Sequence, residues 1–245
     1  MRYAIYFATE RSAPLMELGN AWLGRDPFNG KSIRQPHIEG FSHAEIEKMT
    51  SNPSRYGFHG TLKAPFELEV GQTEAALAQA CRDFASRITP FELKALTVSE
   101  IGGFLALVPA GDEAELSAFA SSCVRYFEPF RAPLSEEDLI RRRQSTLTKA
   151  QDKNLVQWGY PYIFDEFRFH MTLSNKIEHD NDRADLKMAA LRHFDSVLAG
   201  PVPVTSFGLY FEENRGAPFR VHTIFQLTGA DMPSVAAQQL FEEQA

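Results

Sequence analysis

The chain has 245 residues, of which 44% are hydrophobic and 23% charged, and its formal net charge is −7 at pH 7. That length is sufficient for one large domain or two joined lobes with a sizeable core. The negative charge argues against a protein that holds long nucleic acid by its phosphates, whereas a few local donors can still bind a small anion. No apolar run approaches the ~20 residues that a membrane span needs. The chain begins with a short alternating stretch and no signal peptide, so we expect a cytoplasmic protein.

The first part of the chain changes between strand-like and helix-like patterns. The expected elements are a strand over 2–8, a helix over 13–24, a short helix over 42–49, a strand over 58–69, a helix over 73–88, strands over 91–99 and 103–108, and a helix over 112–127. Gly102-Gly103, between the two later strands, is a hairpin signal. We expect the long region 25–57 to form a wall or lid of a binding site, because long loops often do so.

The last part of the chain repeats this order. We expect a strand over 167–177, a polar connection over 178–183, a helix over 184–198, strands over 201–211 and 219–227, and a short helix over 232–245. Residues 128–166 have no counterpart. Within them, acids precede the run Arg141-Arg142-Arg143, as in a helix whose charges favour its dipole, so this run is either a solvated helix face or a phosphate clamp. The aromatic turn at 158–162 is either a hydrophobic plug or a wall on which a sugar or base stacks.

A five-residue motif occurs in both parts. It reads Phe58-His59-Gly60-Thr61-Leu62 in the first and Phe169-His170-Met171-Thr172-Leu173 in the second. The two histidines are 170 − 59 = 111 residues apart, and Pro90 and Pro201 have the same separation. A spacing preserved across a strand, a helix and a further strand indicates an internal duplication.

Each copy of the motif alternates with period 2, so its apolar residues point toward a core and the others point out. The residues that point out are His59, Thr61 and Lys63 in the first copy and Arg168, His170 and Thr172 in the second. Two histidines on facing strands suit displacement at phosphorus, because one ring takes a proton from the attacking group and the other gives one to the leaving oxygen. The threonine hydroxyls can donate to phosphate oxygens. This scheme requires no metal or other cofactor.

Four further residues are candidates for ligand binding. Lys63 and Arg168 either neutralise phosphate charge or are, respectively, a sheet-edge charge and part of a surface ion pair. Tyr56, which precedes the first motif, and Tyr160, in the aromatic turn, are candidate substrate-binding residues.

The remaining histidines and the cysteines do not form a metal-ligand pattern. No His-x-x-x-His or Cys-x-x-Cys spacing occurs, which argues against a zinc site. Cys81 and Cys123 lie in helix-like stretches, and we interpret them as buried free thiols. The histidines without a repeat partner, interpreted as surface or core residues, are His37, His43, His179, His193 and His222.

The doubled His-x-Thr motif, each copy followed by Leu, resembles the signature of the 2H phosphoesterase superfamily. The stretches 2–7, 22–26, 55–63, 103–109 and 158–162 resemble, more narrowly, the branch found with bacterial phosphonate-utilisation genes. The resemblance implies a duplicated, two-lobed α+β fold, in which antiparallel sheets face a central cleft and helices pack outside. It also implies metal-independent cleavage of a small cyclic phosphate ester, for this branch a ribose cyclic phosphate made during carbon–phosphorus bond cleavage.

We therefore expect a single bilobal domain over 1–245. Its parts are repeat one at about 1–127, an inserted connection at about 128–161, repeat two at about 162–230 and a helical tail at about 232–245. The expected function is a cyclic phosphodiesterase in which His59 and His170 are the acid/base pair and Thr61 and Thr172 hold the phosphate. Two alternatives stay open: an enzyme for RNA ends that carry 2′,3′-cyclic phosphates, and a non-catalytic module that binds a nucleotide or phosphate ester. In each case the expected partner is a small ligand, with no long nucleic acid and no membrane.

Overall fold

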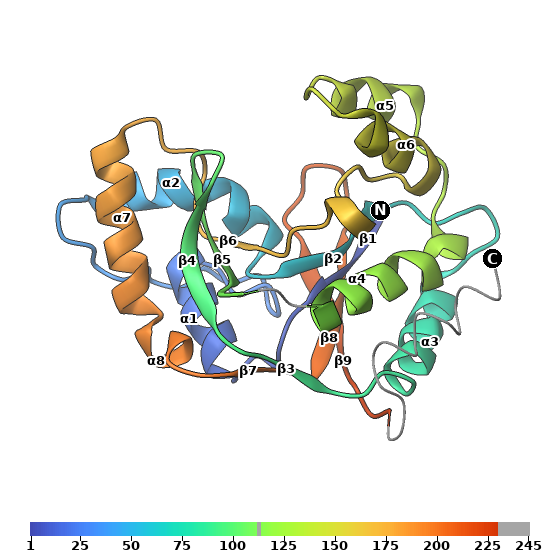
Figure 1. Ribbon diagram of the computed structural model, residues 1–245, viewed down its shortest axis with the longest axis horizontal. Helices are drawn as coiled ribbons and strands as arrows, with labels where there is room; N and C mark the ends of the chain where they lie inside the picture. The colour runs from blue at the N-terminus through green and yellow to red at the C-terminus, as the bar shows by residue number, and fades with distance from the viewer. Residues whose placement is uncertain (112–113, 230–245) are drawn as a thin grey trace.

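A computed structural model describes residues 1–111 and 114–229 and has an α+β fold (Figure 1). Its strands are β1 (Arg2–Phe7), β2 (Gly60–Phe66), β3 (Phe91–Leu93), β4 (Leu96–Ile101), β5 (Phe104–Pro109), β6 (Met171–Thr172), β7 (Val202–Val204), β8 (Ser206–Glu212) and β9 (Arg220–Gln226). Its α-helices are α1 (Pro14–Leu23), α2 (His43–Tyr56), α3 (Glu74–Ala85), α4 (Ala114–Tyr126), α5 (Glu136–Arg143), α6 (Lys149–Trp158), α7 (Asp180–His193) and α8 (Asp195–Leu198). The tail helix expected over 232–245 lies outside the described residues.

The described strands form three antiparallel sheets, which confirms the fold class expected from the sequence. One sheet has the order β2-β1-β8-β9, the second has the order β4-β5-β6, and β3 pairs with β7 in the third. In Figure 1 the four-stranded sheet lies in the right-hand lobe with α3 and α4, and the three-stranded sheet lies in the left-hand lobe with α7. The paired strands β3 and β7 run along the bottom of the same view, between the two lobes.

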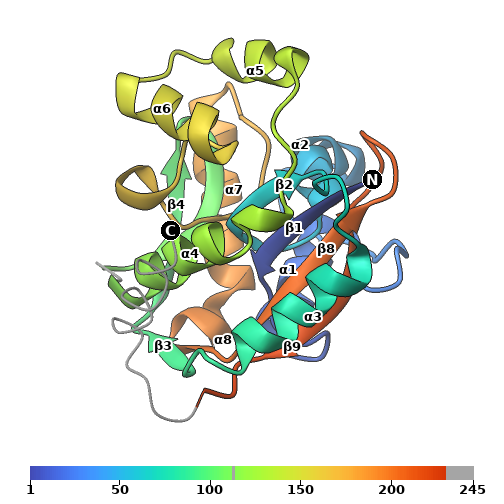
Figure 2. The same ribbon diagram turned by 90° about the vertical axis from the view of Figure 1, so that its right-hand side faces the viewer.

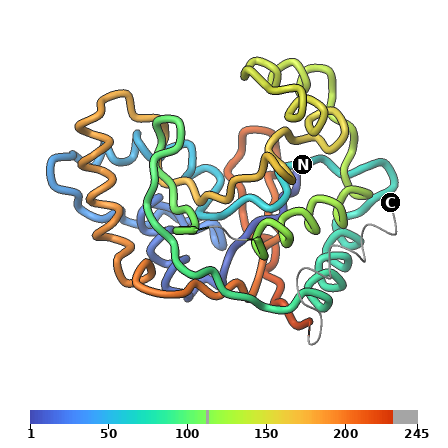
Figure 3. Tube along the Cα trace, viewed as in Figure 1, coloured from blue at the N-terminus to red at the C-terminus, as the bar shows by residue number. Residues whose placement is uncertain are grey.

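Each lobe combines elements from the early and the late part of the chain. The first motif strand, β2, shares its sheet with the late hairpin β8–β9, whereas the second motif strand, β6, pairs with the early strand β5. The helices also pack against strands from the other part of the chain: the early helix α3 contacts the late strands β8 and β9, and the late helix α7 contacts the early strands β4 and β5. In Figure 3 the early and late connecting segments pass side by side at the base of the molecule. The repeat boundaries expected at about 127, 162 and 230 stay a prediction about internal duplication. They are not boundaries between the two lobes, because each lobe contains strands from both expected repeats.

The hairpin expected at Gly102-Gly103 is present. Strands β4 and β5 pair in continuous register up to Ile101 opposite Phe104, which leaves only the two glycines in the turn. Their φ angles are +53° and +93°, and two successive positive φ angles are what a tight hairpin turn of this length requires. Glycine adopts such angles without the steric cost that a side chain would add.

Several element boundaries differ from the expectation. Helix α2 was expected to end at 49 but continues to Tyr56; its Ser42–Glu45 capping box is present as predicted, and Pro53 lies inside the helix. The first motif strand begins only at Gly60, and the second, expected over 167–177, is reduced to Met171–Thr172, where it pairs with β5 alone. The connection expected over 178–183 is wrong, because α7 already begins at Asp180.

The inserted segment contains two α-helices rather than one, with short 3₁₀ helices at Glu128–Phe130 and Phe164–Glu166 on either side of them. Helix α5 has the expected acids in its first turn and arginines in its last, and the Ser135 hydroxyl accepts a hydrogen bond from the backbone N–H of Asp138. Helix α6 was not predicted, although Thr148 and Gln151 form a capping box at its start. The helix has mostly polar residues and buries only Leu155, so its sequence shows no apolar periodicity from which a helix could be predicted. Figures 1 and 2 show α5 and α6 standing above the rest of the fold, over the right-hand lobe of Figure 1.

Aromatic side chains fill much of the core. Phe84 of α3 lies within 6.1 Å, between ring centroids, of Phe119 in α4, Phe127 directly after α4 and Phe207 in β8. All four rings are buried. Such contacts bury large apolar areas and fix α3 and α4 against the four-stranded sheet, which carries the first motif.

Candidate active site

The first histidine of the doubled motif is fixed by the end of helix α2. Nδ1 of His59 lies 2.8 Å from the carbonyl oxygen of Gly57, and because a carbonyl only accepts, this nitrogen carries the proton. Gly57 has φ +77°, and a Cβ at this position would lie 2.7 Å from the Pro27 side chain, so no other residue fits. The opposite nitrogen, Nε2, is left for chemistry and lies 3.4 Å from the Thr61 hydroxyl.

The second histidine is held in the same way. Nδ1 of His170 lies 2.8 Å from the carbonyl oxygen of Arg168, again two residues earlier in the chain. Thr172 follows on β6, opposite Ala106 of β5. Both copies of the motif therefore orient the ring by a backbone carbonyl and leave Nε2 available.

The one residue that differs between the two copies has a structural reason. Gly60 stands between His59 and Thr61, where the second copy has Met171. A Cβ at Gly60 would lie 2.4 Å from the ring of Phe169, the first residue of the second motif. Glycine is thus what allows the two motif segments to pack directly against each other.

His59 lies in an aromatic environment. Its ring stacks on Tyr6 at a centroid distance of 3.8 Å and is 6.1 Å from Tyr56 and 6.4 Å from Tyr210. Burial lowers the pKa of His59 to about 4; the hydrogen bond to Gly57 opposes this, and the charge of His170 adds to it.

A cavity of about 510 Å³ brings residues of the two motifs together. The motif residues that line it are His59, Thr61 and Thr172, and the two predicted tyrosines, Tyr56 and Tyr160, line it as well. His170 is not among its lining residues. A volume of this size is in the range of small-molecule sites.

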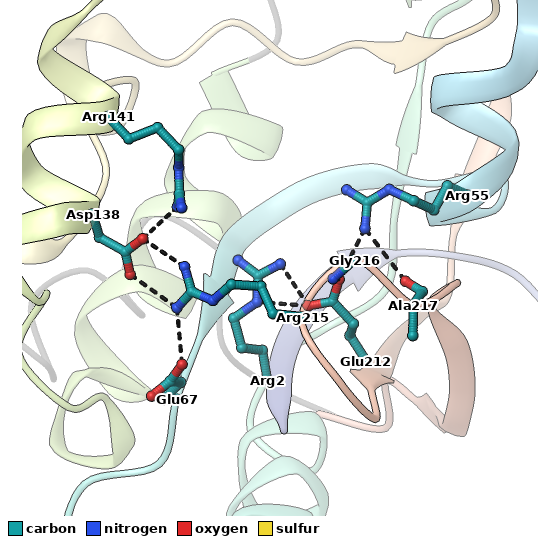
Figure 4. Close-up of polar contacts among 9 residues, drawn as sticks. All are labelled: Arg2, Arg55, Glu67, Asp138, Arg141, Glu212, Arg215, Gly216 and Ala217. Carbon is teal, nitrogen blue, oxygen red and sulfur yellow. Dashed lines mark hydrogen bonds and ion pairs between the residues drawn. The ribbon is translucent and has the colours of Figure 1, made fainter.

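Five arginines also line the cavity: Arg2, Arg55, Arg141, Arg142 and Arg215. Figure 4 shows two groups of charged contacts among them. Arg2 and Arg55 both bind the fully buried Glu212, at 2.5 Å and 2.8 Å. Arg215 binds Asp138 of α5 at 2.6 Å and Glu67 at 2.9 Å, and Asp138 also pairs with Arg141. The cluster is a local positive region in a chain whose net charge is −7.

Two residues expected at the ligand do not line this cavity. Lys63 was predicted to share the outward face with His59, but its side chain is 4% exposed, and its ammonium group binds Glu128 at 2.7 Å and the carbonyl oxygen of Val124 at 2.9 Å. Burial lowers the pKa of Lys63 to about 8, although Glu128 raises it. Arg168 donates to the carbonyl oxygens of Asp165 and Phe167 and does not line the cavity.

The expected walls are present in part. The turn at 158–162 contributes Tyr160, so the stacking-wall interpretation of this turn has a geometric basis. From the 25–57 region only Arg55 and Tyr56, at the end of α2, reach the cavity; Arg25, Arg34 and Gln35 line other hollows of the surface. Sequence analysis missed Arg2 and Tyr6 of β1, Arg55 of α2 and Arg215 after β8 as site residues, because they lie outside both copies of the motif and no sequence spacing connects β1 or Arg215 to them.

Comparison with known families assigns this chain to one of them. A family described as "Protein of unknown function (DUF1045)" matches residues 61–220, which is more than half of the chain. The chain belongs to the DUF1045 family. The matched region includes Thr61, His170 and Thr172 and the whole inserted segment.

Two curated relatives carry a more specific name. A protein of Janthinobacterium sp. (strain Marseille), named ribose 1,5-bisphosphate phosphokinase PhnN, is 38% identical over 223 residues, which cover 89% of this chain and 49% of that protein. A protein of Laribacter hongkongensis (strain HLHK9) with the same name is 32% identical over 238 residues, which cover 97% of this chain and 55% of that protein. The DUF1045 chain thus spans about half the length of the curated relatives it matches.

Two solved structures are similar in outline. The crystal structure of TT0787 of Thermus thermophilus has a TM-score of 0.45 at 16% identity, covering 94% of this chain and 100% of that one. A structure titled "Crystal structure of phosphoesterase" has a TM-score of 0.36 at 13% identity, covering 93% of this chain and 98% of that one. Similarity at this level carries no argument about the chemistry of the DUF1045 chain.

The remaining features of the described part are structural. Cys81 and Cys123 are buried free thiols, as expected, and burial raises the pKa of both thiols. Within residues 1–111 and 114–229 no group of three or more His, Cys, Asp or Glu side chains is placed to hold a metal ion. None of the helices in those residues combines the length and the apolar character needed to cross a membrane.

Proposed function

We propose that the DUF1045 chain is a phosphodiesterase that hydrolyses a small cyclic phosphate ester with the two motif histidines as its acid and base. The observation that carries this proposal is that His59, Thr61 and Thr172, from both copies of the motif, line one arginine-rich cavity. The doubled motif supports membership of the 2H phosphoesterase superfamily. Hydrolysis of a phosphodiester needs a proton acceptor, a proton donor and groups that hold the phosphate. The cavity offers His59 as the acceptor and Thr61 and Thr172 as holding groups, and the proposed donor is His170, two residues before Thr172 in the second copy of the motif.

The environments of the two rings suggest separate roles. His59 has a pKa lowered by burial to about 4, so its ring is neutral at pH 7 and Nε2 can accept a proton from the attacking water. The water oxygen then bonds to phosphorus while one ring ester bond breaks. His170, protonated at Nε2, gives its proton to the leaving alkoxide. The products are a phosphate monoester and a free hydroxyl, with one water consumed, and no step requires a metal ion.

The threonines serve the phosphate in this scheme, in a cavity that its arginines make locally positive. The hydroxyls of Thr61 and Thr172 donate to its non-bridging oxygens and keep phosphorus in line with the attacking water. A bound anion also raises the pKa of His59, because an opposite charge nearby favours the charged form of the ring. Substrate binding therefore brings His59 closer to the working range of a general base.

The names of the relatives suggest a ligand class. Both are named for ribose 1,5-bisphosphate, so we propose a ribose phosphate ester as the ligand of this chain. We do not extend the kinase activity in those names to this chain, because its sequence contains no G-x-x-x-x-G-K-[ST] run, the loop with which P-loop kinases hold phosphates. About half of each relative's length lies outside the match.

An activity assay on purified protein tests the proposal. Hydrolysis of a panel of ribose cyclic phosphates, nucleoside cyclic phosphates and short RNAs that end in a 2′,3′-cyclic phosphate is measured as the appearance of a phosphate monoester, with wild type, His59→Ala and His170→Ala compared. Turnover by the wild type alone supports the enzyme. Ligand binding without turnover would favour the non-catalytic binding module, and turnover only of RNA ends would favour the RNA-end enzyme.

A further inference from the structure

Arg142 stands apart from the other arginines of the cavity. Arg2, Arg55, Arg141 and Arg215 each form an ion pair with a carboxylate. Arg142 forms none with any residue that the structure describes, and its buried Nε has no hydrogen-bond partner. An unpaired, partly buried guanidinium is costly in a ligand-free protein, because water is removed and no anion replaces it. Such a charge is expected where a ligand supplies the anion.

The side chain of Arg142 is supported by an aromatic ring. Its guanidinium carbon lies 5.2 Å from the centroid of Tyr160, within cation–π range. Arg142 lies on α5, and Tyr160 follows α6 after Gly159, which adopts φ +75°. Both residues therefore come from the inserted segment that has no counterpart in the other half of the chain. The contact holds the guanidinium in place without neutralising it.

Arg142 also borders a second hollow that the motif residues do not reach. A second cavity, of about 180 Å³, adjoins the first beneath α5. Arg142 and Tyr160 line both cavities, whereas His59, Thr61 and Thr172 line only the larger one. Arg142 therefore faces space that the motif residues do not line, in addition to the cavity that it shares with them.

We propose that Arg142, held by Tyr160, is the specificity-determining contact for a second anionic group of the ligand, away from the motif histidines. The preferred ligand then carries two phosphates: one at the motif residues and one at Arg142. This inference deepens the proposed function, but the binding site stands even if the histidines catalyse nothing. It assigns ligand selection to the inserted helices α5 and α6.

Calorimetric binding of two sugars that contain no phosphodiester separates this inference from catalysis. Ribose 5-phosphate and ribose 1,5-bisphosphate differ by one phosphate group. We expect wild type to bind the bisphosphate roughly 10–100-fold more tightly, the range for one charge-assisted contact. Arg142→Met should remove this preference and leave the affinity for ribose 5-phosphate within about threefold.

Two comparisons within the inserted segment control the experiment. Arg143→Met changes the next arginine of α5, which is exposed and paired with Asp152, and should retain the wild-type preference. Tyr160→Phe keeps the aromatic face and should also retain it, whereas Tyr160→Leu should lose most of it. Arg142→Lys keeps the charge and provides a folded variant if Arg142→Met has a lowered melting temperature.

Some outcomes would overturn the inference. An unchanged bisphosphate preference in a folded Arg142→Met protein would show that Arg142 does not contact the second phosphate. An equal loss of affinity for both sugars would place Arg142 at the motif phosphate instead. Failure of wild type to hydrolyse any cyclic phosphate would refute the proposed function, yet it would leave this binding difference intact.

Discussion

The two copies of the motif share their residues but not their surroundings. In both, a carbonyl oxygen two residues earlier fixes Nδ1 of the histidine at 2.8 Å. His59 then stacks on Tyr6, near two further tyrosines, whereas His170 has Phe104 at 5.8 Å between ring centroids. His59 directly precedes a seven-residue strand inside a four-stranded sheet, and His170 precedes a strand of two residues. The same orientation in two different environments allows one ring to be a base and the other an acid.

The largest effect should come from removing either ring. His59→Ala and His170→Ala should each lower kcat by roughly 10²–10⁴, the range for one general acid or base. Because both act in one transition state, the double variant should lose less than the product of the two single losses. Steady-state kinetics on a cyclic phosphate that the wild type hydrolyses measures kcat for the two single variants and the double variant. A folded, fully active His170→Ala protein would reduce the second copy to a remnant of duplication.

The contact between the copies can be broken at Gly60. Gly60→Ala places a methyl group within 2.4 Å of the ring of Phe169. We expect a loss of roughly 1–3 kcal/mol in the free energy of unfolding, as for overpacked cores, together with lower activity. Chemical denaturation measures the free energy of unfolding. The additional change Phe169→Leu, made in the Gly60→Ala protein, should restore part of the lost stability. Gly200→Ala is the control, since a Cβ there meets no atom within 4 Å; an equal loss in both variants would refute the close packing of the motifs.

The low pKa of His59 predicts a pH-dependent stability. The ring titrates near 6.5 in the unfolded chain and near 4 in the folded protein, so as pH falls from 6.5 to 4 the unfolded state takes up a proton that the folded state does not. The folded protein should lose at most about 3 kcal/mol over this window. His59→Gln, which does not titrate, should lose correspondingly less than wild type. Parallel pH–stability curves of the two proteins would contradict the lowered pKa.

The threonines should matter less than the histidines. Thr61→Ala or Thr172→Ala should cost roughly 0.5–3 kcal/mol of transition-state stabilisation, the span from a neutral to a charge-assisted hydrogen bond. Thr→Ser at either position retains the hydroxyl and should recover most of the rate. If serine is no better than alanine, the hydroxyl does not hold the phosphate.

A chelator should have the smallest effect. The proposed scheme takes both proton transfers from imidazole rings, so the rate should be the same with and without excess EDTA. Complete loss of activity that zinc or manganese restores would mean that a metal ion, and not the pair of rings, activates the water.

Local patterns predicted well wherever chain neighbours decide the structure. The Ser42–Glu45 capping box, the Gly102-Gly103 turn and the burial of Phe58 and Leu62 all followed from residues close in sequence. In each case the hydrogen bond or the side-chain direction is set within a few residues.

What the sequence could not supply was long-range pairing. Lys63 was placed on the ligand face by alternation, but irregular register between β1 and β2 and the carboxylate of Glu128 place it inside the protein. Arg2 and Arg215 meet the cavity from opposite ends of the chain, and nothing in their neighbours marks them. The sequence also did not predict that β2 shares a sheet with the late hairpin β8–β9 while β6 pairs with the early strand β5, because a repeat in sequence does not say which strands pair.

A structure of the protein with bound phosphate or sulfate tests the central claim most directly. We predict one ion between the two motif copies, with Nε2 of His59 and Nε2 of His170 each within about 3.2 Å of its oxygens, the reach of a general acid or base. The hydroxyls of Thr61 and Thr172 should bind the same ion. An ion held by only one copy, with the other ring turned away from it, would contradict a shared acid/base site.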